Sequence, residues 1–326
     1  MWETLLGKDF RVSALGLGCS SMSHGYNPGK RDDRESAEVV RRAVDLGVTL
    51  FDTADVYGPY ANEELLGRAL SSCGSKAAVA TKCGLVATPD GTLSRNGRPD
   101  FLRRACEGSL RRLGREAIDL YQLHRVDPAV PLEETWGALG ELVTEGKVRA
   151  LGISHATVDE LDRVQAVFPL TAVQYELSVW STANLDSVLA WCRDNGVGFL
   201  AFAPLGRGYL SGRVDEAGLA ATDSRRRDPR FAPDAVRVNR AIVDGLRLIA
   251  ERHGATPSQI AIAWVLAQGP GVVPIPGTRR LRWLEENVAA TGLELTEQDL
   301  KEIAELPAAM GEMSWDRDRF PTALER

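Results

Sequence analysis

The sequence has 326 residues, with 39 Lys and Arg against 45 Asp and Glu, so its formal net charge is −6. This mild acidity argues against binding to nucleic acid or to an anionic membrane, and we expect neither partner. No apolar run reaches the ~18 residues that a membrane-spanning helix needs, and the first residues do not have the pattern of a signal peptide. Five scattered cysteines form no CxxC pair, which is typical of a reduced cytoplasmic protein without a disulfide framework or a bound metal.

In chain order, short apolar runs alternate with amphipathic segments. The runs are near-continuous, as expected of parallel strands covered on both faces, and they span residues 12–18, 48–53, 77–83, 118–124, 148–154, 171–176, 197–204 and 272–276. Helical patterns lie between them at 35–47, 101–114, 132–146 and 185–196, each ending in a glycine suited to a left-handed helix cap. This repeat favours a closed (β/α)₈ barrel over an open doubly wound sheet, although the alternation alone does not separate the two.

Two segments depart from the repeat. Residues 206–233 are too long for a plain connection and predict a loop over one face. The tail that follows a predicted helix at 296–306 is expected to lie over the barrel mouth. Since no linker composition interrupts the chain, we expect residues 1–326 to form a single barrel domain with loop insertions.

Polar residues stand at or just after the ends of three consecutive predicted strands. They are Asp52 and Tyr57, then Lys82, then His124. Barrel active sites form at the carboxyl ends of the strands, so these side chains are expected to meet. An ammonium lowers the pKa of a nearby phenol, a carboxylate keeps that ammonium charged, and an imidazole orients a carbonyl. Each residue alone could be a cap, a turn or a packed side chain, but together they suit protonation of an oxygen during hydride transfer.

These residues belong to motifs through which the sequence resembles the aldo-keto reductase superfamily, and the resemblance extends over almost the whole length of the chain. The resemblance rests on several motifs in the expected order, among them LGLGC (15–19), FDTADVYG (51–58), IDLYQLHRVDP (118–128), AFAPLGRGYLSG (201–212) and VPIPGTRRLRWLEENV (273–288). It is closest to the bacterial and fungal branch with a PIPGT-R segment. The resemblance implies that Tyr57 is the general acid of carbonyl reduction, that Lys82 lowers its pKa, that Asp52 pairs with Lys82, and that His124 orients the substrate.

The resemblance also implies an extended NADPH site without a Rossmann fold, and no GxGxxG motif opens a helix in the sequence. The nicotinamide end would contact Gly18, Cys19, Asp52, Ser154, His155, Gln174 and Phe202. The pyrophosphate would be wrapped by Ala203, Pro204, Leu205, Gly206 and Arg207. The adenosine and its 2′-phosphate would contact Gly277, Thr278, Arg279, Trp283, Glu286 and Asn287. A helix N-terminus beside Arg279 is a suitable phosphate site, although the arginines there could also form only a solvated basic face.

Three positions depart from the usual family residues. His155 replaces the commonest Asn, Phe202 replaces Tyr or Trp, and Trp283 replaces Gln. We expect these changes to alter cofactor geometry rather than cofactor use, and Trp283 could either stack on adenine or cover the barrel exterior. The carbonyl substrate is expected to meet apolar and aromatic walls, for which the candidates are Met22, Tyr26, Leu85, Trp315 and Phe320.

Two other functions remain open at this point. Potassium-channel β subunits share the barrel, so a cofactor-binding sensor with slow turnover is one alternative. A barrel aldolase with a Schiff base on Lys82 is the other. We favour an NADPH-dependent reductase of small carbonyl compounds, and we expect a monomer or a weak homo-oligomer.

Overall fold

A computed structural model describes residues 1–23, 25–26, 31–71, 73, 77–87, 92–214 and 219–311. Eight parallel strands form one sheet in the order β12-β11-β10-β9-β8-β5-β4-β3. Their bounds are β3 (Leu17–Gly18), β4 (Leu50–Asp52), β5 (Ala78–Cys83), β8 (Ile118–Leu123), β9 (Val148–Ser154), β10 (Ala172–Glu176), β11 (Gly198–Phe202) and β12 (Val272–Pro274). The Gly16 and Gly18 N–H groups donate to the Pro274 and Pro276 carbonyls at 3.0 and 3.2 Å and so join the two edges. The predicted (β/α)₈ barrel is thereby confirmed.

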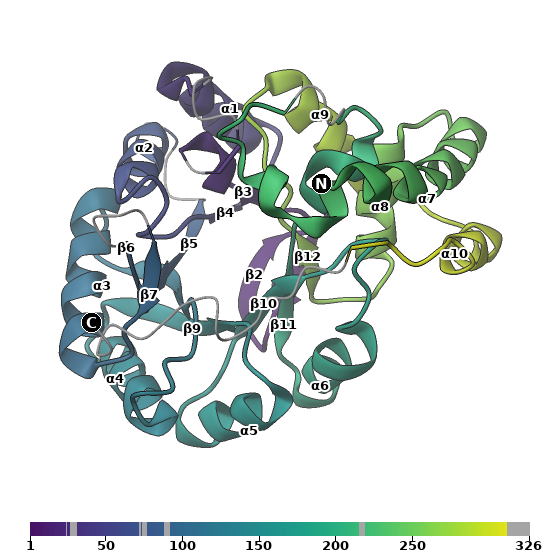
Figure 1. Ribbon diagram of the computed structural model, residues 1–326. Coiled ribbons are helices and arrows are strands. Elements are labelled where there is room, and N and C mark those ends of the chain that lie inside the picture. Colours follow the sequence, from purple (N-terminus) through teal and green to yellow (C-terminus); the bar gives the residue numbers. More distant parts are fainter. Residues whose placement is uncertain are drawn as a thin grey trace.

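Helices surround this barrel (Figure 1). They are α1 (Asp33–Asp45), α2 (Ala61–Leu70), α3 (Pro99–Leu113), α4 (Leu132–Thr144), α5 (Val158–Val167), α6 (Ala190–Asn195), α7 (Pro233–Arg252), α8 (Pro257–Leu266), α9 (Leu281–Ala289) and α10 (Glu297–Ala304). The glycines predicted to cap four of them, Gly47, Gly114, Gly146 and Gly196, all have positive φ. The predicted helix at 185–196 is divided into a π-helical turn (Leu185–Leu189) and α6. Within the described ranges, no helix combines the length and the apolar character needed to cross a membrane.

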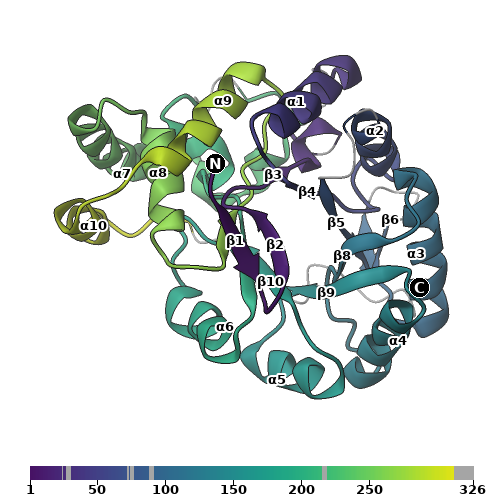
Figure 2. The same ribbon diagram turned by 180° about the vertical axis from the view of Figure 1, so that it is seen from behind.

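An antiparallel hairpin of β1 (Glu3–Leu6) and β2 (Phe10–Ser13) covers the amino-terminal end of the barrel (Figure 2). The predicted first strand at 12–18 was therefore too long, because this apolar run includes the end of β2 as well as the short barrel strand β3. Leu6 and Val12 pack into the barrel interior with Leu50 and Leu120. A methyl group at Gly198 would lie 2.5 Å from Leu6 Cδ2, so the hairpin packs directly on the backbone of β11.

The opposite end of the barrel carries the insertions. A second hairpin, β6 (Leu85–Ala87) with β7 (Leu93–Arg95), follows β5. The long segment after β11 is not a plain loop, because its described part contains 3₁₀ turns at Gly206–Ser211, Ser224–Arg227 and Pro229–Phe231. Both insertions lie on the face that Figure 1 presents. The tail predicted to cover the mouth, with Trp315 and Phe320, lies outside the described residues beyond Gly311.

Candidate active site

The barrel interior is built in layers, because residues two apart on a strand face the same side. The lower layer is apolar and packs on the amino-terminal hairpin; it includes Leu50, Ala80, Leu120, Ala172 and Leu200. Two residues further along the same strands stand Asp52, Lys82, Gln122, Gln174 and Phe202. The strand register therefore places a polar layer directly on a dry, packed base.

A buried ion pair lies at the centre of this polar layer. Lys82 is fully buried, and its Nζ donates to Asp52 Oδ1 at 2.6 Å and to the Thr53 carbonyl at 2.8 Å. The second Asp52 oxygen, Oδ2, accepts from Gln174 Nε2 at 2.7 Å and from Gln122 Nε2 at 3.1 Å. Each carboxylate oxygen thus has a partner, which is the condition for holding an ion pair out of water.

Tyr57 and His124 complete the group that the sequence analysis singled out. Lys82 Nζ lies 5.3 Å from the centroid of the Tyr57 ring. The rings of Tyr57 and His124 meet edge to face, with centroids 5.9 Å apart. The structure therefore brings together all four side chains expected at the strand ends.

Burial and neighbouring charges shift the pKa values of Tyr57 and Lys82 in opposite directions. Burial raises the pKa of Tyr57 above its ordinary value, although the Lys82 charge lowers it. The pKa of Lys82 is raised, because Asp52 and Tyr57 together outweigh its burial. The expected effect of Lys82 on Tyr57 is therefore present but does not dominate, because desolvation disfavours the phenolate more strongly.

Four of the residues expected near a nicotinamide, Ser154, His155, Gln174 and Phe202, lie on or just after β9, β10 and β11. Ser154 Oγ donates to the Gln174 carbonyl at 2.9 Å. The His155 ring packs between Phe202 and Tyr175, with centroid distances of 5.5 and 5.3 Å. Burial and the nearby Arg125 charge hold the pKa of His155 well below its usual range, so that its imidazole is neutral at pH 7.

Backbone strain and close packing mark the same region. Four non-glycine residues of the described chain have positive φ, and three of them, His155, Ala203 and Arg207, belong to the expected cofactor site. Strained residues of this kind cluster at ligand sites. Gly18 and Gly277, both expected to contact the cofactor, have no space for a side chain. A methyl group on Gly18 would lie 2.6 Å from the Ile275 carbonyl oxygen, and one on Gly277 would lie 2.8 Å from the Gly18 carbonyl oxygen. Cys19, beside Gly18, is a buried thiol whose pKa is raised by burial and by Asp52.

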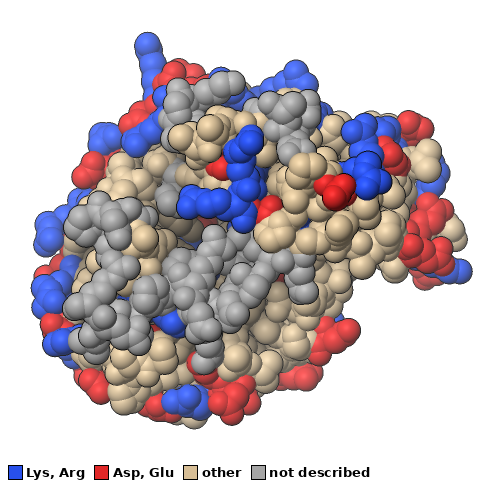
Figure 3. All heavy atoms as spheres, viewed as in Figure 1, with Lys and Arg blue, Asp and Glu red and all other residues tan. Residues whose placement is uncertain are grey.

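The long segment after β11 brings further charges to this face. Arg207 has its side chain 10% exposed, with Nε 3.4 Å from Asp228 Oδ2. Its neighbours in the expected pyrophosphate segment, Pro204, Leu205 and Gly206, are buried or half-buried. Figure 3 shows basic side chains gathered near the middle of this face, which is an arrangement suited to an anionic ligand.

The expected adenosine end is formed by the loop after β12 and by α9. Burial, together with repulsion from Arg280, lowers the pKa of Arg279, so an anion bound there would be stabilised. Thr278, the residue before it, and Asn287 on α9 are buried. Glu286 forms a two-bond ion pair with Arg213 at 3.0 and 3.1 Å.

The two earlier interpretations of Trp283, adenine stacking or exterior cover, can now be compared with its contacts. The guanidinium groups of Arg213 and Arg282 lie 4.0 and 3.9 Å from the centroid of its ring. The ring therefore packs against cations in this structure, and an adenine would have to share or displace one of these contacts.

The expected substrate walls are found in different surroundings. Leu85 is buried in a small apolar cluster with Ala54 and Val56, against which Tyr57 packs. Tyr26 is half-buried, with the Arg225 guanidinium 5.0 Å from its ring centroid. Met22 is buried in the large core that the helices share with the barrel.

Sequence reasoning missed several residues that support this site. Gln122 donates a hydrogen bond to Asp52. Its position two residues after Leu120 and two before His124 could have indicated that a polar side chain points into the barrel. Asn62 on α2 donates to the Cys19 carbonyl at 2.9 Å. Arg125, directly after His124, donates to Ser154 Oγ at 3.3 Å. Neither of the last two residues has a local sequence signal, since both depend on how distant segments pack.

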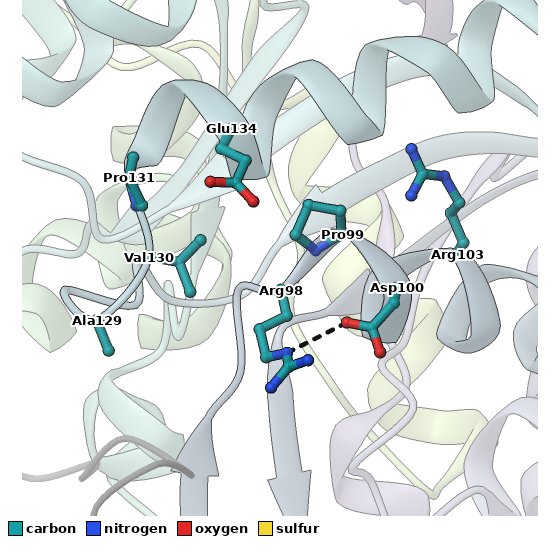
Figure 4. A pocket seen from close by; sticks show the side chains of 8 residues that line it. All are labelled: Arg98, Pro99, Asp100, Arg103, Ala129, Val130, Pro131 and Glu134. Carbon is teal, nitrogen blue, oxygen red and sulfur yellow. Dashed lines mark hydrogen bonds and ion pairs between the residues drawn. The ribbon is translucent and has the colours of Figure 1, made fainter.

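A separate hollow of about 520 Å³ lies outside the barrel, between the beginnings of α3 and α4 (Figure 4). Its lining includes Arg98, Asp100 and Glu134, and Arg98 is paired with Asp100 at 3.2 Å. None of the expected catalytic or cofactor residues lines it, so it is distinct from the candidate site in the barrel mouth.

Comparisons with known proteins bear on the family and on the fold. A probable aldo-keto reductase 1 from Glycine max is 41% identical over 297 residues, which cover 91% of this chain and 86% of that protein. The glycerol dehydrogenase AKR11B4 from Gluconobacter oxydans has a similar structure, with a TM-score of 0.86, 31% identity, and 96% and 99% of the two chains covered. The holo form of aldo-keto reductase AKR11C1 from Bacillus halodurans gives a TM-score of 0.77 at 25% identity, covering 96% and 98%. The model of the aldo/keto reductase family matches residues 14–308, and the chain therefore belongs to this family of oxidoreductases.

Proposed function

We propose that this protein reduces an aldehyde or a ketone to the alcohol with NADPH, and that Tyr57 supplies the proton. The observation that carries the proposal is the buried Asp52–Lys82 ion pair, 2.6 Å long, with the Tyr57 ring beside the Lys82 ammonium. Enclosing a charged lysine next to a phenol costs desolvation energy. That cost is accounted for if the charge stabilises a phenolate during turnover.

The residues present fit a nicotinamide cofactor that carries a 2′-phosphate. Arg279 is a half-buried cation crowded by Arg280, which favours a bound anion. Gly18 and Gly277 offer bare backbone, where a Cβ atom would be too close to its neighbours. When bound, NADPH supplies a hydride to the carbonyl carbon.

In this proposal the chain's own residues manage the proton. Because burial raises the pKa of Tyr57, its hydroxyl is protonated at pH 7 and can donate to the carbonyl oxygen of the substrate. Asp52 keeps Lys82 charged, and that charge stabilises the phenolate left behind. The His124 ring, edge to face with Tyr57, borders the position where the carbonyl would bind.

The same ion pair argues against the aldolase alternative. A Schiff base requires a neutral lysine amine, whereas the raised pKa of Lys82 keeps the amine protonated. We propose that the enzyme acts in the cytoplasm on a small carbonyl compound, as a monomer or a weak homo-oligomer.

The proposal is tested with the purified protein in one cuvette. NADPH binding is measured first, followed by the decay of its absorbance with a panel of aldehydes and ketones. We expect binding and substrate-dependent decay, and we expect Tyr57→Phe to retain NADPH affinity while losing nearly all turnover. Near-normal turnover of that variant would remove Tyr57 from its proposed role. Tight binding without decay across the panel would favour a cofactor sensor.

A further inference from the structure

A buried cluster of charges lies where the long segment after β11 returns to the barrel. The Arg230 side chain is 4% exposed, and its Nη1 donates at 2.6 Å to Oε1 of Glu176, at the end of β10. The same guanidinium donates to both oxygens of Asp228, at 3.1 and 2.9 Å. Glu176 and Asp228 are also almost fully buried. These buried ion pairs hold the three side chains in one arrangement, because breaking any of the pairs would leave a buried charge without a partner.

Trp180, in the turn after β10, joins the two ends of this segment. Gly206, at the beginning of the segment, lies against the indole so closely that a methyl group there would be 2.5 Å from Trp180 Cε2. Tyr209 stacks on the same indole with centroids 4.9 Å apart. At the other end, the Arg230 guanidinium lies 4.7 Å from the ring centroid. We call Glu176, Trp180, Asp228 and Arg230 the β10 anchor.

Besides the packing of Trp180 on Gly206, the β10 anchor contacts Arg207, the last residue of the expected pyrophosphate segment. Asp228 Oδ2, which accepts from Arg230, also faces Arg207 Nε at 3.4 Å. Arg207 has φ of 55° and lies between Gly206 and Gly208, which also have positive φ. Glycine adopts this conformation freely, whereas an arginine needs outside contacts to hold it.

We propose that Asp228 and Arg230 are positioning residues for the cofactor, which hold Arg207 in its strained conformation so that it can bind the pyrophosphate. The inference rests on the proposed function, since it assumes that NADPH occupies the mouth. Asp228 orients the Arg207 guanidinium, Arg230 orients Asp228, and Glu176 fixes Arg230 to the barrel. Neither Asp228 nor Arg230 needs to contact the cofactor itself.

The test uses two variants. Asp228→Asn keeps an oxygen that can accept from Arg230 but removes the negative charge that faces Arg207. Arg230→Lys keeps the positive charge but cannot donate to both oxygens of Asp228 in the way the guanidinium does. We expect each variant to bind NADPH about tenfold more weakly, because it weakens one charge-assisted contact. Affinity for 2′-AMP, which has no pyrophosphate, should stay unchanged. Equal losses for both ligands would indicate general loosening of the fold and would overturn the positioning role.

A double variant separates positioning from stability. In an Arg207→Met background, Asp228→Asn should weaken NADPH binding no further, although it should still lower the unfolding midpoint. Additive losses of NADPH affinity would overturn the inference.

Arg115→Lys is the matched control, because Arg115 pairs with the buried Asp119 at 3.0 Å at the beginning of β8, the far end of the barrel. It should lower the unfolding midpoint and leave NADPH binding unchanged. If the wild-type protein bound no NADPH, the proposed function would fail as well. If the wild-type protein and the Asp228→Asn variant bound NADPH with equal affinity, only the positioning role would fail.

Discussion

Replacement of Asp52 by asparagine tests the central ion pair most directly. The Asp52 carboxylate accepts from Lys82 Nζ at 2.6 Å and from the amides of Gln174 and Gln122 at 2.7 and 3.1 Å. An asparagine of the same shape brings its own N–H₂ group toward these donors, so at least one contact becomes repulsive. Losing one partner of a buried pair costs about 3–5 kcal/mol of stability. Turnover should fall by roughly 10²–10⁴, the usual contribution of a positioned proton donor.

The pH dependence of stability gives the sharper result. In the wild type the pKa of Lys82 is higher in the folded than in the unfolded protein. The stabilisation that its charge gives the folded state is therefore fully present below the unfolded value of ~10.4, and it is lost only as the pH rises above that value. In Asp52→Asn the burial of Lys82 remains without its counterion, so its folded pKa falls below the unfolded one. The unfolded chain then binds the extra proton, and the variant should gain about 1.4 kcal/mol per pH unit relative to wild type as pH rises toward ~10.

Denaturant unfolding at several pH values between 7 and 10 measures this slope. The matched control is Asp119→Asn, because Asp119 is 6% exposed and also accepts several hydrogen bonds, including one from Arg115 at 3.0 Å. Arginine does not titrate in this range, so the control should lose stability without a new slope. The same slope in both variants, or none in Asp52→Asn, would refute the assignment of a buried, charged Lys82.

Three further outcomes are expected. Arg279→Ala should weaken NADPH binding by about tenfold or more and NADH binding much less in a fluorescence titration, because only NADPH carries the 2′-phosphate; equal losses would count against a phosphate contact. Gly18→Ala should lower the unfolding free energy by about 1–3 kcal/mol in denaturant melts, since its Cβ would lie 2.6 Å from the Ile275 carbonyl. Initial rates of reduction should stay level from pH 8 to 9 and fall only at higher pH, because the pKa of Tyr57 is raised and its hydroxyl stays protonated; a fall near pH 8 would contradict this.

The barrel and the four strand-end residues could be predicted from the sequence, because both depend on local patterns. A polar residue that interrupts an apolar run, such as Asp52 after Leu50 and Phe51, marks the point where a strand leaves the packed interior. The same two-residue period would also have identified Gln122, which stands two positions after Leu120 and two before His124. It was missed because it carries no reactive group, although it supports one that does.

The contacts of the long segment after β11 could not be predicted in this way. Arg230 and Glu176 are separated by 54 residues, and Arg213 and Glu286 by 73. Their pairing depends on how the whole intervening chain folds, and no local pattern around either partner indicates it. The amino-terminal hairpin was missed for a related reason, because one apolar run covers the end of β2 and the beginning of the barrel strand.

The departure of His155 from the usual family residue has a physical explanation only once the backbone is known. This position has φ of 56°, and asparagine and histidine are both among the few non-glycine residues enriched in the left-handed region. The exchange therefore keeps the strained turn after β9 while it replaces a small amide with an aromatic ring. That ring packs on Phe202, another position that departs from the usual family residue. Since Phe202 has no hydroxyl or indole N–H to satisfy, its ring can pack at a tilt against the neutral imidazole without leaving a polar group of its own buried and unpaired.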